Sequence, residues 1–412
     1  MNTFNIHYYI VFIILSITVQ IQSQICEKTA QYGQCSTNNA CGCFHILGAD
    51  DGAGICGFLW PICSRLVPCN SSDNSCLQSN TICVQHPQCD DRPLCYPVTM
   101  MKENICPPMI ININSKWKQN AITIAGGNGQ GSELNQLNQP YGMYVDNDDQ
   151  CIYIADGGNH RIVRWEFDAA NGQIVAGGNG MGSAINQLNY PMDAILDREK
   201  KHLIICDYGN MRVVRWSRQN SQDQQILIPF IGCWGLAMDN NGDLYISDME
   251  RHQVRRWQEG DREGTIVAGG NGQGNQFNQL SNPTYIFVDE YYSIYVADTR
   301  NNRVMKWMKN AAEGIRIAPT QVPEENPGSM VGPTGVIVDH MGNIYVSNMG
   351  SHQITRWSPD EMEGAPVVGK KEDGSGSTQL SYSYDLSFDR YGNLYVVDTE
   401  NNRIQKFIIN LD

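Results

Sequence analysis

After its first 23 residues the sequence has no apolar run that approaches the roughly 18 residues needed to span a bilayer as a helix. It also lacks a sustained 3.6-residue apolar period, which argues against helical repeats. Basic residues are outnumbered, with 29 Lys and Arg against 43 Asp and Glu, and most of the excess acid falls in residues 120–412. Because an acidic surface repels phosphate backbones, this balance disfavours a nucleic-acid partner.

Motifs for several catalytic and metal-binding sites are also missing. The sequence contains no G-x-S-x-G nucleophile elbow, no C-x-x-C pair and no cysteine/histidine pattern typical of a RING domain. Three glycine-rich loops at 128–137, 179–188 and 271–280 contain no lysine and open no predicted helix. They therefore do not have the features of phosphate-binding loops.

The N-terminal residues 1–23 are predicted to be a secretory signal peptide. Their apolar stretch at 8–19 is short for a membrane span, and small-residue cleavage is expected before Gln24. We therefore expect a secreted, extracellular protein with no membrane insertion after cleavage. An uncleaved anchor is the alternative.

Cysteine is concentrated in residues 24–108, which hold twelve of the fifteen. An even number of cysteines in so short a segment predicts a disulfide-rich module whose connectivity the sequence leaves open. Asn70 begins an N-x-S triplet and is predicted to be glycosylated. The expected disulfide-forming residues of this module are Cys26, Cys35, Cys41, Cys43, Cys56, Cys63, Cys69, Cys76, Cys83, Cys89, Cys95 and Cys106.

One unit recurs six times in the rest of the chain. Its most regular part is IYVADTRNNRVMKW at 294–307, with counterparts at 152–165, 203–216, 244–257, 344–357 and 394–407. Each copy follows an apolar run that ends in Asp, and these Asp residues recur every 42 to 51 residues. Short runs rich in Val, Ile, Tyr and Trp predict four strands per unit. Four strands in about 50 residues is the spacing of a β-propeller blade.

The six units predict an all-β fold, a six-bladed β-propeller over residues 120–412. The last unit ends after its third strand at 403–407, and a strand-like segment at 122–127 matches the fourth strands of other units. We expect this N-terminal strand to complete the last blade and close the ring, which removes an open sheet edge. Residues 109–119 are then predicted to be a linker.

These repeats resemble the NHL repeat, which has the pattern P-x-G, then IYVAD, then N-x-R, and Asn159-His160-Arg161 reproduces its N-H-R core. The resemblance covers roughly residues 120–412 and implies the propeller fold. It does not imply one function, since NHL propellers include ubiquitin-ligase substrate modules, RNA binders, a peptide-amidating lyase and extracellular proteins. The amidating lyases carry zinc-binding histidines directly after the blade-opening proline, and no histidine stands at that position here.

Charged and cysteine residues within the repeat have structural explanations. The Asp that ends the second strand, as at 156, 207, 298 and 398, is expected to pair with the Arg five residues later. Blade five loses both charges together, with Asn348 and Gln353, whereas blade three keeps Asp248 but has Gln253. A disulfide between Cys206 and Cys233 is predicted, which leaves Cys151 as a buried thiol.

Three histidines at equivalent turns, His160, His252 and His352, could in principle form a zinc site, but those turns should lie too far from the axis. We expect no bound metal at this turn and no required cofactor, although a structural calcium ion is compatible with the fold. The residues expected to ring the mouth of the central channel are those after the blade-opening position, namely Tyr141, Met192, Trp234, Thr284, Thr334 and Tyr384.

These observations favour a non-catalytic recognition or scaffold protein that binds an extracellular protein or glycan through the loop face and channel mouth. The alternative is an extracellular metal-dependent propeller enzyme, either an amidating-lyase-like enzyme or a lactonase-like hydrolase. The alternative for the mouth residues, including the aromatic Tyr141, Trp234 and Tyr384, is that they simply pack between the blades.

Overall fold

A computed structural model describes residues 25–27, 41–45, 53–58, 66–70, 75–77, 81–86, 89–90, 92–97, 115–220, 223–319, 330–339, 341–359 and 363–410. The chain divides into two compact units, Met1–Asn112 and Ile113–Asp412, which are described separately. The predicted signal peptide lies outside the described residues. In the described part, no helix is both long enough and apolar enough to cross a membrane.

The N-terminal unit contains two small three-stranded sheets. The first has the order β1-β3-β2 and the second the order β4-β6-β5. The aromatic ring of Phe44 packs against Tyr96, with centroids 4.8 Å apart, and against His86, at 5.0 Å. The strands are β1 (Ile25–Glu27), β2 (Cys41–His45), β3 (Ala53–Phe58), β4 (Val67–Pro68), β5 (Thr81–Val84) and β6 (Leu94–Pro97).

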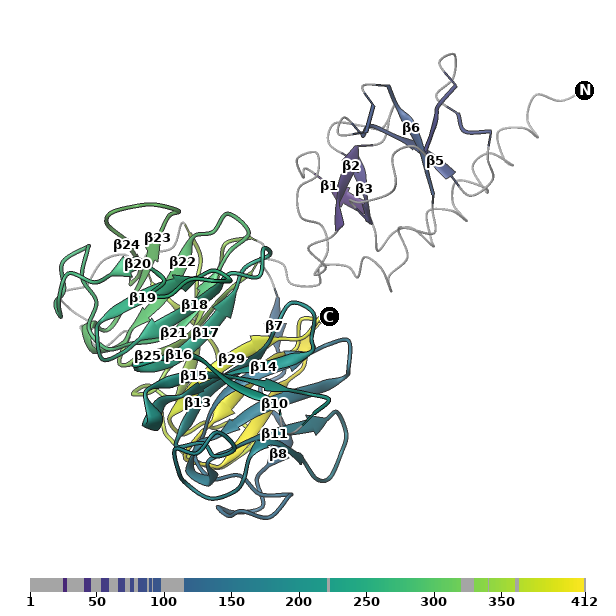
Figure 1. The fold of residues 1–412 in the computed structure, drawn as a ribbon. Coiled ribbons are helices and arrows are strands. Elements are labelled where there is room, and N and C mark those ends of the chain that lie inside the picture. The colour runs from purple at the N-terminus through teal and green to yellow at the C-terminus, as the bar shows by residue number, and fades with distance from the viewer. Residues whose placement is uncertain are drawn as a thin grey trace, which may run out of the picture. The chain divides into compact units, whose positions relative to one another are not determined.

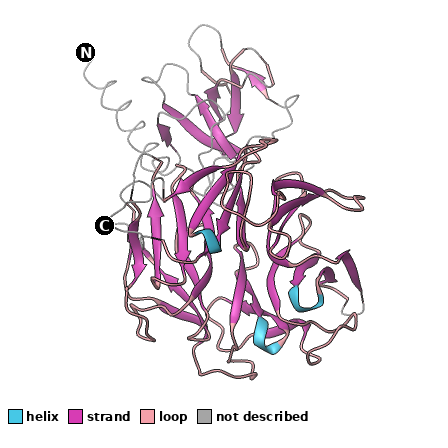
Figure 2. Ribbon diagram, turned by 90° about the vertical axis from the view of Figure 1, so that its left-hand side faces the viewer, coloured by secondary structure: helices cyan, strands magenta, loops and turns pink. Residues whose placement is uncertain are grey.

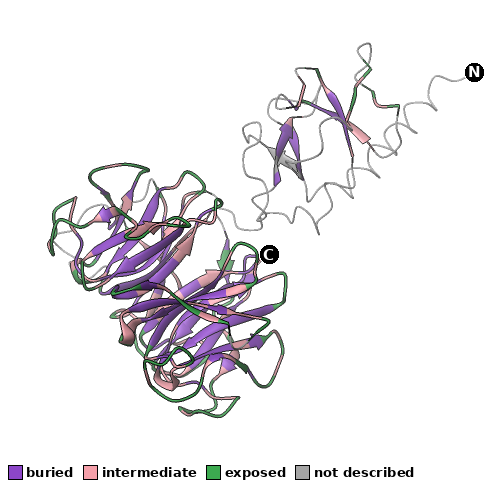
Figure 3. Ribbon diagram, viewed as in Figure 1, coloured by how far each residue is buried: buried purple, intermediate pink, exposed green. Residues whose placement is uncertain are grey.

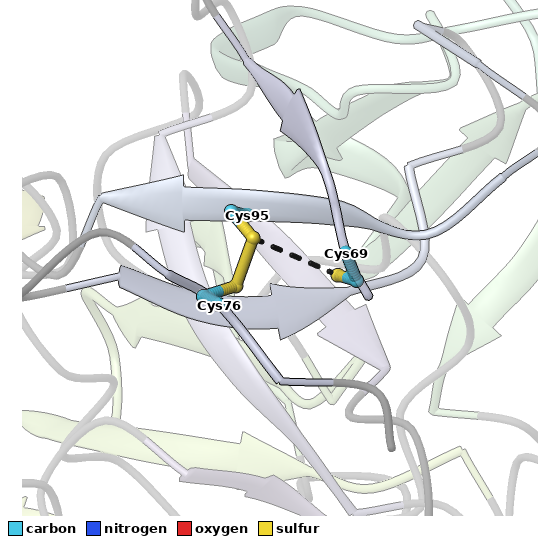
Figure 4. Close-up of side chains that lie close together, drawn as sticks. All are labelled: Cys69, Cys76 and Cys95. Atoms are coloured by element: carbon cyan, nitrogen blue, oxygen red, sulfur yellow. Dashed lines mark hydrogen bonds between the residues drawn. A yellow bond between two sulfur atoms is a disulfide. The ribbon is translucent and has the colours of Figure 1, made fainter. Parts of the chain in front are cut away.

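Disulfides brace the second of these sheets. Cys69 is bonded to Cys83 and Cys76 to Cys95, and the sulfur of Cys95 lies 3.9 Å from that of Cys69 (Figure 4). A sheet this small buries little apolar surface, so covalent links are the expected source of its stability. Four further cysteines are also disulfide-bonded: Cys41, Cys43, Cys56 and Cys89. Cys35, Cys63, Cys106 and the side chain of Cys26 lie outside the described residues.

The second unit is a six-bladed β-propeller made of six four-stranded antiparallel sheets (Figures 1 and 2). Blade 1 comprises β9 (Pro140–Asp146), β10 (Cys151–Asp156), β11 (Arg161–Glu166) and β12 (Gln173–Gly177). Blade 2 comprises β13 (Pro191–Leu196), β14 (His202–Asp207), β15 (Arg212–Ser217) and β16 (Gln224–Pro229). Blade 3 comprises β17 (Cys233–Met238), β18 (Leu244–Asp248), β19 (Gln253–Trp257) and β20 (Thr265–Gly269).

The remaining blades repeat this arrangement. Blade 4 comprises β21 (Pro283–Val288), β22 (Ile294–Asp298), β23 (Arg303–Trp307) and β24 (Ile315–Ala318). Blade 5 comprises β25 (Pro333–Val338), β26 (Ile344–Asn348), β27 (Gln353–Trp357) and β28 (Ala365–Gly369). Blade 6 comprises β29 (Ser383–Phe388), β30 (Leu394–Asp398), β31 (Arg403–Phe407) and, from the start of the domain, β8 (Ile122–Gly126).

The pairing of β8 with β31 confirms that an N-terminal strand closes the ring. The segment 109–119 is not all linker, because β7 (Lys116–Trp117) pairs with β32 (Ile409–Asn410). Trp117 is buried, donates a hydrogen bond from Nε1 to the Gly392 carbonyl at 2.8 Å and stacks on Phe388. A single tryptophan in a short polar stretch gives no strand pattern, so the sequence did not predict this extension.

Packing between adjacent blades forms the core. The second strands are buried almost throughout, whereas the loops and turns are exposed (Figure 3). The first strands contact one another in a closed circuit around the axis, each touching the first strand of the next blade. In blades 1, 2 and 4 the turn between the second and third strands contains a short 3-10 helix, η4 (Gly157–Asn159), η5 (Tyr208–Asn210) and η6 (Thr299–Asn301).

Candidate functional site

Buried ion pairs between Asp and Arg brace four of the six blades. In blade 4, Arg303 Nε lies 2.6 Å from an Asp298 carboxylate oxygen, and both side chains are almost fully buried. The same guanidinium donates to the carbonyls of Asn275, Gln276 and Gln279, so it also fixes the glycine-rich loop. Equivalent pairs join Arg161 to Asp156, Arg212 to Asp207 and Arg403 to Asp398. The expected pairs are therefore present and serve a structural role.

Blades 3 and 5 depart from this pattern in different ways. In blade 3, Arg251 replaces the missing partner, with its Nη1 2.9 Å from an Asp248 oxygen. In blade 5, the Asn348 amide donates to Thr355 Oγ1 at 2.9 Å, so no buried charge needs a partner. Burial of an unpaired charge is costly, and each blade avoids it.

The turn histidines link adjacent blades instead of converging. His160 Nδ1 accepts a hydrogen bond from the Tyr190 backbone N–H at 3.1 Å, and His252 and His352 accept equivalent bonds from Asn282 and Tyr382. Asn402 makes the same contact through its side-chain oxygen. These residues have left-handed backbone conformations, with φ between 51° and 55°. No zinc site is formed by these three residues.

Three of the six residues expected at the channel mouth come together as an aromatic cluster. Tyr141 of blade 1 lies edge-on to Trp234 of blade 3, with ring centroids 6.1 Å apart, and to Tyr384 of blade 6, at 5.1 Å. Trp234 stacks on Tyr384 at 6.2 Å, and Tyr208 of blade 2 contacts Trp234 at 5.5 Å. We call these four half-buried side chains the aromatic mouth.

The other three expected mouth residues do not present a binding surface. Met192, Thr284 and Thr334 are buried. The Thr284 hydroxyl donates to the Thr334 carbonyl at 2.7 Å, and the Thr334 hydroxyl donates to the Ser383 carbonyl at 2.9 Å. The two threonines therefore connect neighbouring first strands.

Exposed aromatic side chains lie in the loops that lead into the first strands next to the aromatic mouth. Tyr190 and Tyr382 are 39% and 43% exposed, and Phe230, in the equivalent loop of blade 3, is 78% exposed. All three have positive φ, between 46° and 58°. The residue directly before the first strand is Tyr190 in blade 2 and Tyr382 in blade 6. In blades 1, 3, 4 and 5 it is Gln139, Gly232, Asn282 and Gly332, of which Asn282 and Gly332 adopt the left-handed region at low cost.

A second layer of the channel contains two buried carboxyl groups and a tyrosine. The third residue of the first strand is Gly142, Asp193, Gly235, Tyr285, Gly335 and Asp385 in blades 1 to 6. The Tyr285 hydroxyl donates to the Met192 carbonyl at 2.9 Å and so passes blade 3 to reach blade 2. A Cβ on Gly235 would lie 2.9 Å from the Tyr285 Cα, which explains the glycine there.

Burial is the largest cause of the shifted pKa values of the two carboxyl groups and the tyrosine in this layer. Burial, together with the neighbouring Asp385 carboxyl, raises the pKa of Asp193 well above its ordinary value. Burial also raises the pKa of Asp385, to about 7, although backbone N–H groups of Met143 and Leu386 partly oppose the shift. The pKa of the buried Tyr285 hydroxyl is raised for the same reason and by both nearby carboxyls. The buried pair therefore holds a proton more readily than ordinary carboxyl groups do.

The sequence contains a signal for this layer, but we did not predict the layer from it. The NHL pattern P-x-G places glycine at this position, and three blades replace that glycine in alternation. The two aspartates lie in blades 2 and 6, far apart in sequence, and only the ring closure brings them to the same level. An alignment of the six repeats would show the substitutions but not their proximity.

Within the described residues one group of three cysteine, histidine or acidic side chains is close enough to share a metal ion: Cys69, Cys76 and Cys95. Disulfides occupy all three sulfurs, so they do not offer thiolate ligands. Cys206 is bonded to Cys233, with Cα atoms 5.2 Å apart, as the sequence predicts, and Cys151 is buried with a free thiol. Asn70 is exposed, as glycosylation requires.

Comparison with known proteins agrees with this architecture. The NHL repeat family model matches residues 230–257. No curated protein matches the chain. A protein of unknown function from Bacteroides thetaiotaomicron is similar in structure, with 16% identity, 94% of each chain covered and a TM-score of 0.56.

Two further similar structures carry descriptions of different kinds. An auxiliary nutrient binding protein from Bacteroides ovatus has 11% identity, covers 77% of this chain and 86% of its own, and gives a TM-score of 0.54. A gluconolactonase from Xanthomonas campestris has 12% identity, covers 71% of this chain and 100% of its own, and gives a TM-score of 0.50. Identities this low establish the fold alone. The second unit of this chain is therefore a β-propeller, and one of its repeats, at residues 230–257, matches the NHL repeat.

Proposed function

We propose that this protein is a secreted recognition protein whose propeller binds an extracellular protein or glycan at the aromatic mouth. The observation that carries the proposal is the convergence of Tyr141, Trp234 and Tyr384 from blades 1, 3 and 6 at one end of the channel. Half-buried aromatic side chains provide a large, rigid contact area and are enriched at binding sites.

Exposed residues around the mouth support the same function. Tyr190 and Tyr382 adopt a left-handed conformation that costs a non-glycine residue about 1 kcal/mol or more. Their histidine neighbours hold them there, since His160 and His352 each accept the tyrosine N–H and contact its ring edge-on. A costly conformation that keeps a large aromatic side chain at the surface fits a contact residue.

One polar atom at the mouth also lacks a hydrogen-bond partner among the described residues. Trp234 Nε1 is buried and has no hydrogen-bond partner in the described structure. An indole N–H usually finds a partner when it is buried, so a bound carbonyl or hydroxyl oxygen would satisfy this donor. The disulfides of both units agree with an oxidising compartment, which is the setting that secretion provides.

The test is a binding screen of the secreted protein against arrays of glycans and of extracellular proteins, followed by titration of each ligand found. The double variant Tyr190→Ala/Tyr382→Ala should bind at least about 10-fold more weakly, as expected for loss of aromatic contacts. Tyr291→Ala is the matched control, since Tyr291 is 73% exposed but lies in a turn between the first and second strands of blade 4. Unchanged affinity in the double variant would show that Tyr190 and Tyr382 do not contact the ligand and would contradict binding at this end of the channel.

An enzyme is the second candidate, and one observation favours it. Asp193 and Asp385 have raised pKa values, as general acids and bases often have. However, each carboxylate already accepts two backbone N–H bonds, which is the arrangement of a structural acid. Hydrolysis of lactones by the wild-type protein, abolished in Asp385→Asn, would replace the recognition proposal by this one.

A further inference from the structure

The central channel contains a cavity of about 510 Å³ that is separate from the aromatic mouth. Its lining begins at Asp193, Tyr285 and Asp385 and includes none of the four residues of the aromatic mouth. From there it follows the first strands to exposed turn residues such as Arg198 and Asn240. It therefore reaches solvent at the face where the first strands end, and its inner end is the carboxyl layer.

The two carboxyl groups at this inner end have no cationic partner among the residues that the structure describes. Asp193 accepts the N–H groups of Ala194 and Leu236, both at 2.8 Å. Asp385 accepts those of Leu386, at 2.8 Å, and Met143, at 2.9 Å. Backbone amides orient the two carboxyl groups but bring no net charge, so any negative charge that the pair carries near neutral pH has no cationic partner in the described structure.

The basic residues in the lining do not supply this charge. Lys200 Nζ lies 2.7 Å from Asp146 and 2.6 Å from Asp148, and one Arg198 Nη donates to the Asn241 carbonyl at 3.4 Å. Both belong to the outer turns. Neither makes an ion pair with the inner carboxyls in the described structure.

The walls between the inner end and the rim are mainly apolar. Residues from all six first strands contribute, among them Val145, Ile195, Leu236, Ile286, Val336 and Leu386. A cavity of a few hundred Å³ with apolar walls and a few convergent polar groups is the usual form of a small-molecule site. A ligand for this cavity therefore needs a positively charged group that faces the carboxyl pair and an apolar part that contacts the walls.

We propose that this cavity binds a small primary alkylamine, with its ammonium group at Asp193 and Asp385 and its alkyl chain along the apolar walls. An ammonium group supplies three N–H donors and one positive charge, which suits two carboxylates that each keep spare acceptor capacity. A divalent ion fits less well, because calcium takes six to eight oxygen ligands and the walls offer few. The cavity opens at the opposite end of the channel from the aromatic mouth, and the proposal does not depend on the function of that mouth.

The experiment uses the full-length protein and n-butylammonium chloride as the probe, with calorimetry and ligand-observed NMR as readouts. We expect n-butylammonium to bind at least about 10-fold more tightly than n-butanol, which has the same alkyl chain without the charge. Butyrate should not bind. Equal binding of butanol would overturn the proposal, because the cavity would then be an apolar site only.

Variants locate the site and do not rely on one substitution. Asp193→Asn/Asp385→Asn should weaken n-butylammonium binding by at least about 10-fold, whereas Asp148→Asn, at an exposed acid outside the cavity lining, should leave it unchanged. If the double variant does not fold, Asn240→Trp, at the exposed rim, should reduce binding by obstructing the opening. Full binding by a folded double variant would overturn the proposal. Where the double variant does not fold, unchanged affinity in Asn240→Trp would overturn it. So would calcium binding that displaces the amine from a stoichiometric site.

Discussion

The carboxylate of Asp193 in blade 2 accepts a hydrogen bond from the backbone N–H of Leu236 in blade 3, at 2.8 Å. Asp385 makes the same contact across the junction between blades 6 and 1, where it accepts the Met143 N–H at 2.9 Å. Each acid thus joins its own first strand to the next one. Both remain buried close to a second carboxyl and to the Tyr285 ring, so their contribution to stability depends on protonation.

Stability should therefore fall as the pH rises through neutrality. The folded-state pKa of Asp385 is raised to about 7, so its proton favours the folded state. This stabilisation is full below the ordinary carboxyl pKa of 3.8 and is lost as the pH rises through about 7. In urea unfolding between about pH 4.5 and pH 7, the free energy of unfolding of Asp385→Asn should fall with rising pH less steeply than that of the wild type, by up to about 1.4 kcal/mol per pH unit. Asp148→Asn is the control, and parallel curves for wild type and Asp385→Asn would contradict the prediction.

Removal of both members of a buried ion pair should cost less than the sum of the two single removals. Arg303→Gln leaves Asp298 buried without a cation and should lower the free energy of unfolding by about 3 to 5 kcal/mol. Asp298→Asn/Arg303→Gln reproduces the Asn and Gln of blade 5 and should lose less than the two single variants together. Chemical denaturation of all three variants measures the coupling. Strict additivity would show that the pair does not interact energetically.

The turn histidine should be replaceable by asparagine but not by leucine. His160 accepts the Tyr190 N–H in a left-handed conformation, and Asn402 makes the equivalent bond in blade 6. We expect His160→Asn to stay within about 0.5 kcal/mol of wild type and His160→Leu to lose about 1 to 2 kcal/mol.

Met211→Leu controls for the backbone conformation, because Met211 has φ 53° but joins blade 3 through its carbonyl oxygen. Burial lowers the pKa of His160, so its stabilisation is present above the ordinary pKa of 6.5 and is lost as the pH falls through the lowered value. Equal stability of His160→Leu and wild type would contradict the proposed link.

The disulfide between blades 2 and 3 should stabilise the propeller substantially. Cys206 and Cys233 are separated by 27 residues, for which the chain-entropy model gives about 3.5 kcal/mol. Cys206→Ala/Cys233→Ala should therefore unfold at a clearly lower urea concentration. Cys151→Ala, at the buried free thiol, should lose only about 1 kcal/mol. The prediction is wrong if the double variant has the stability of Cys151→Ala or better.

Most of the propeller could be predicted from sequence because each blade repeats the same local signals. Strands of about five residues, turns with glycine and an Asp–Arg spacing of five recur in register, and the unmatched strand at 122–126 identified the closure. The blade 3 exception could not be resolved in advance. Arg251, three residues after Asp248, occupies the place of an asparagine in other blades, and only the structure shows its guanidinium turned back to the carboxylate.

The site was harder to predict because it depends on which blades face one another. Sequence placed Tyr141, Trp234 and Tyr384 at one level of the channel, but it could not show that Thr284 and Thr334 turn away to bond backbone carbonyls. Asp193 and Asp385 look like ordinary substitutions within their own repeats. Their shared burial, and hence their raised pKa values, exists only once the ring is closed.

The blade built from both ends of the domain has a consequence for synthesis of the protein. On the ribosome β8 emerges before every other blade strand, yet its partner β31 is the last of them to leave the exit tunnel. Until β31 has emerged, β8 has apolar side chains and backbone groups without a strand partner. The growing blade 6 likewise has an unpaired outer edge. Blades 1 to 5 are complete by then, so a late ribosomal stall would release a nearly finished ring whose two unpaired edges favour association with other chains.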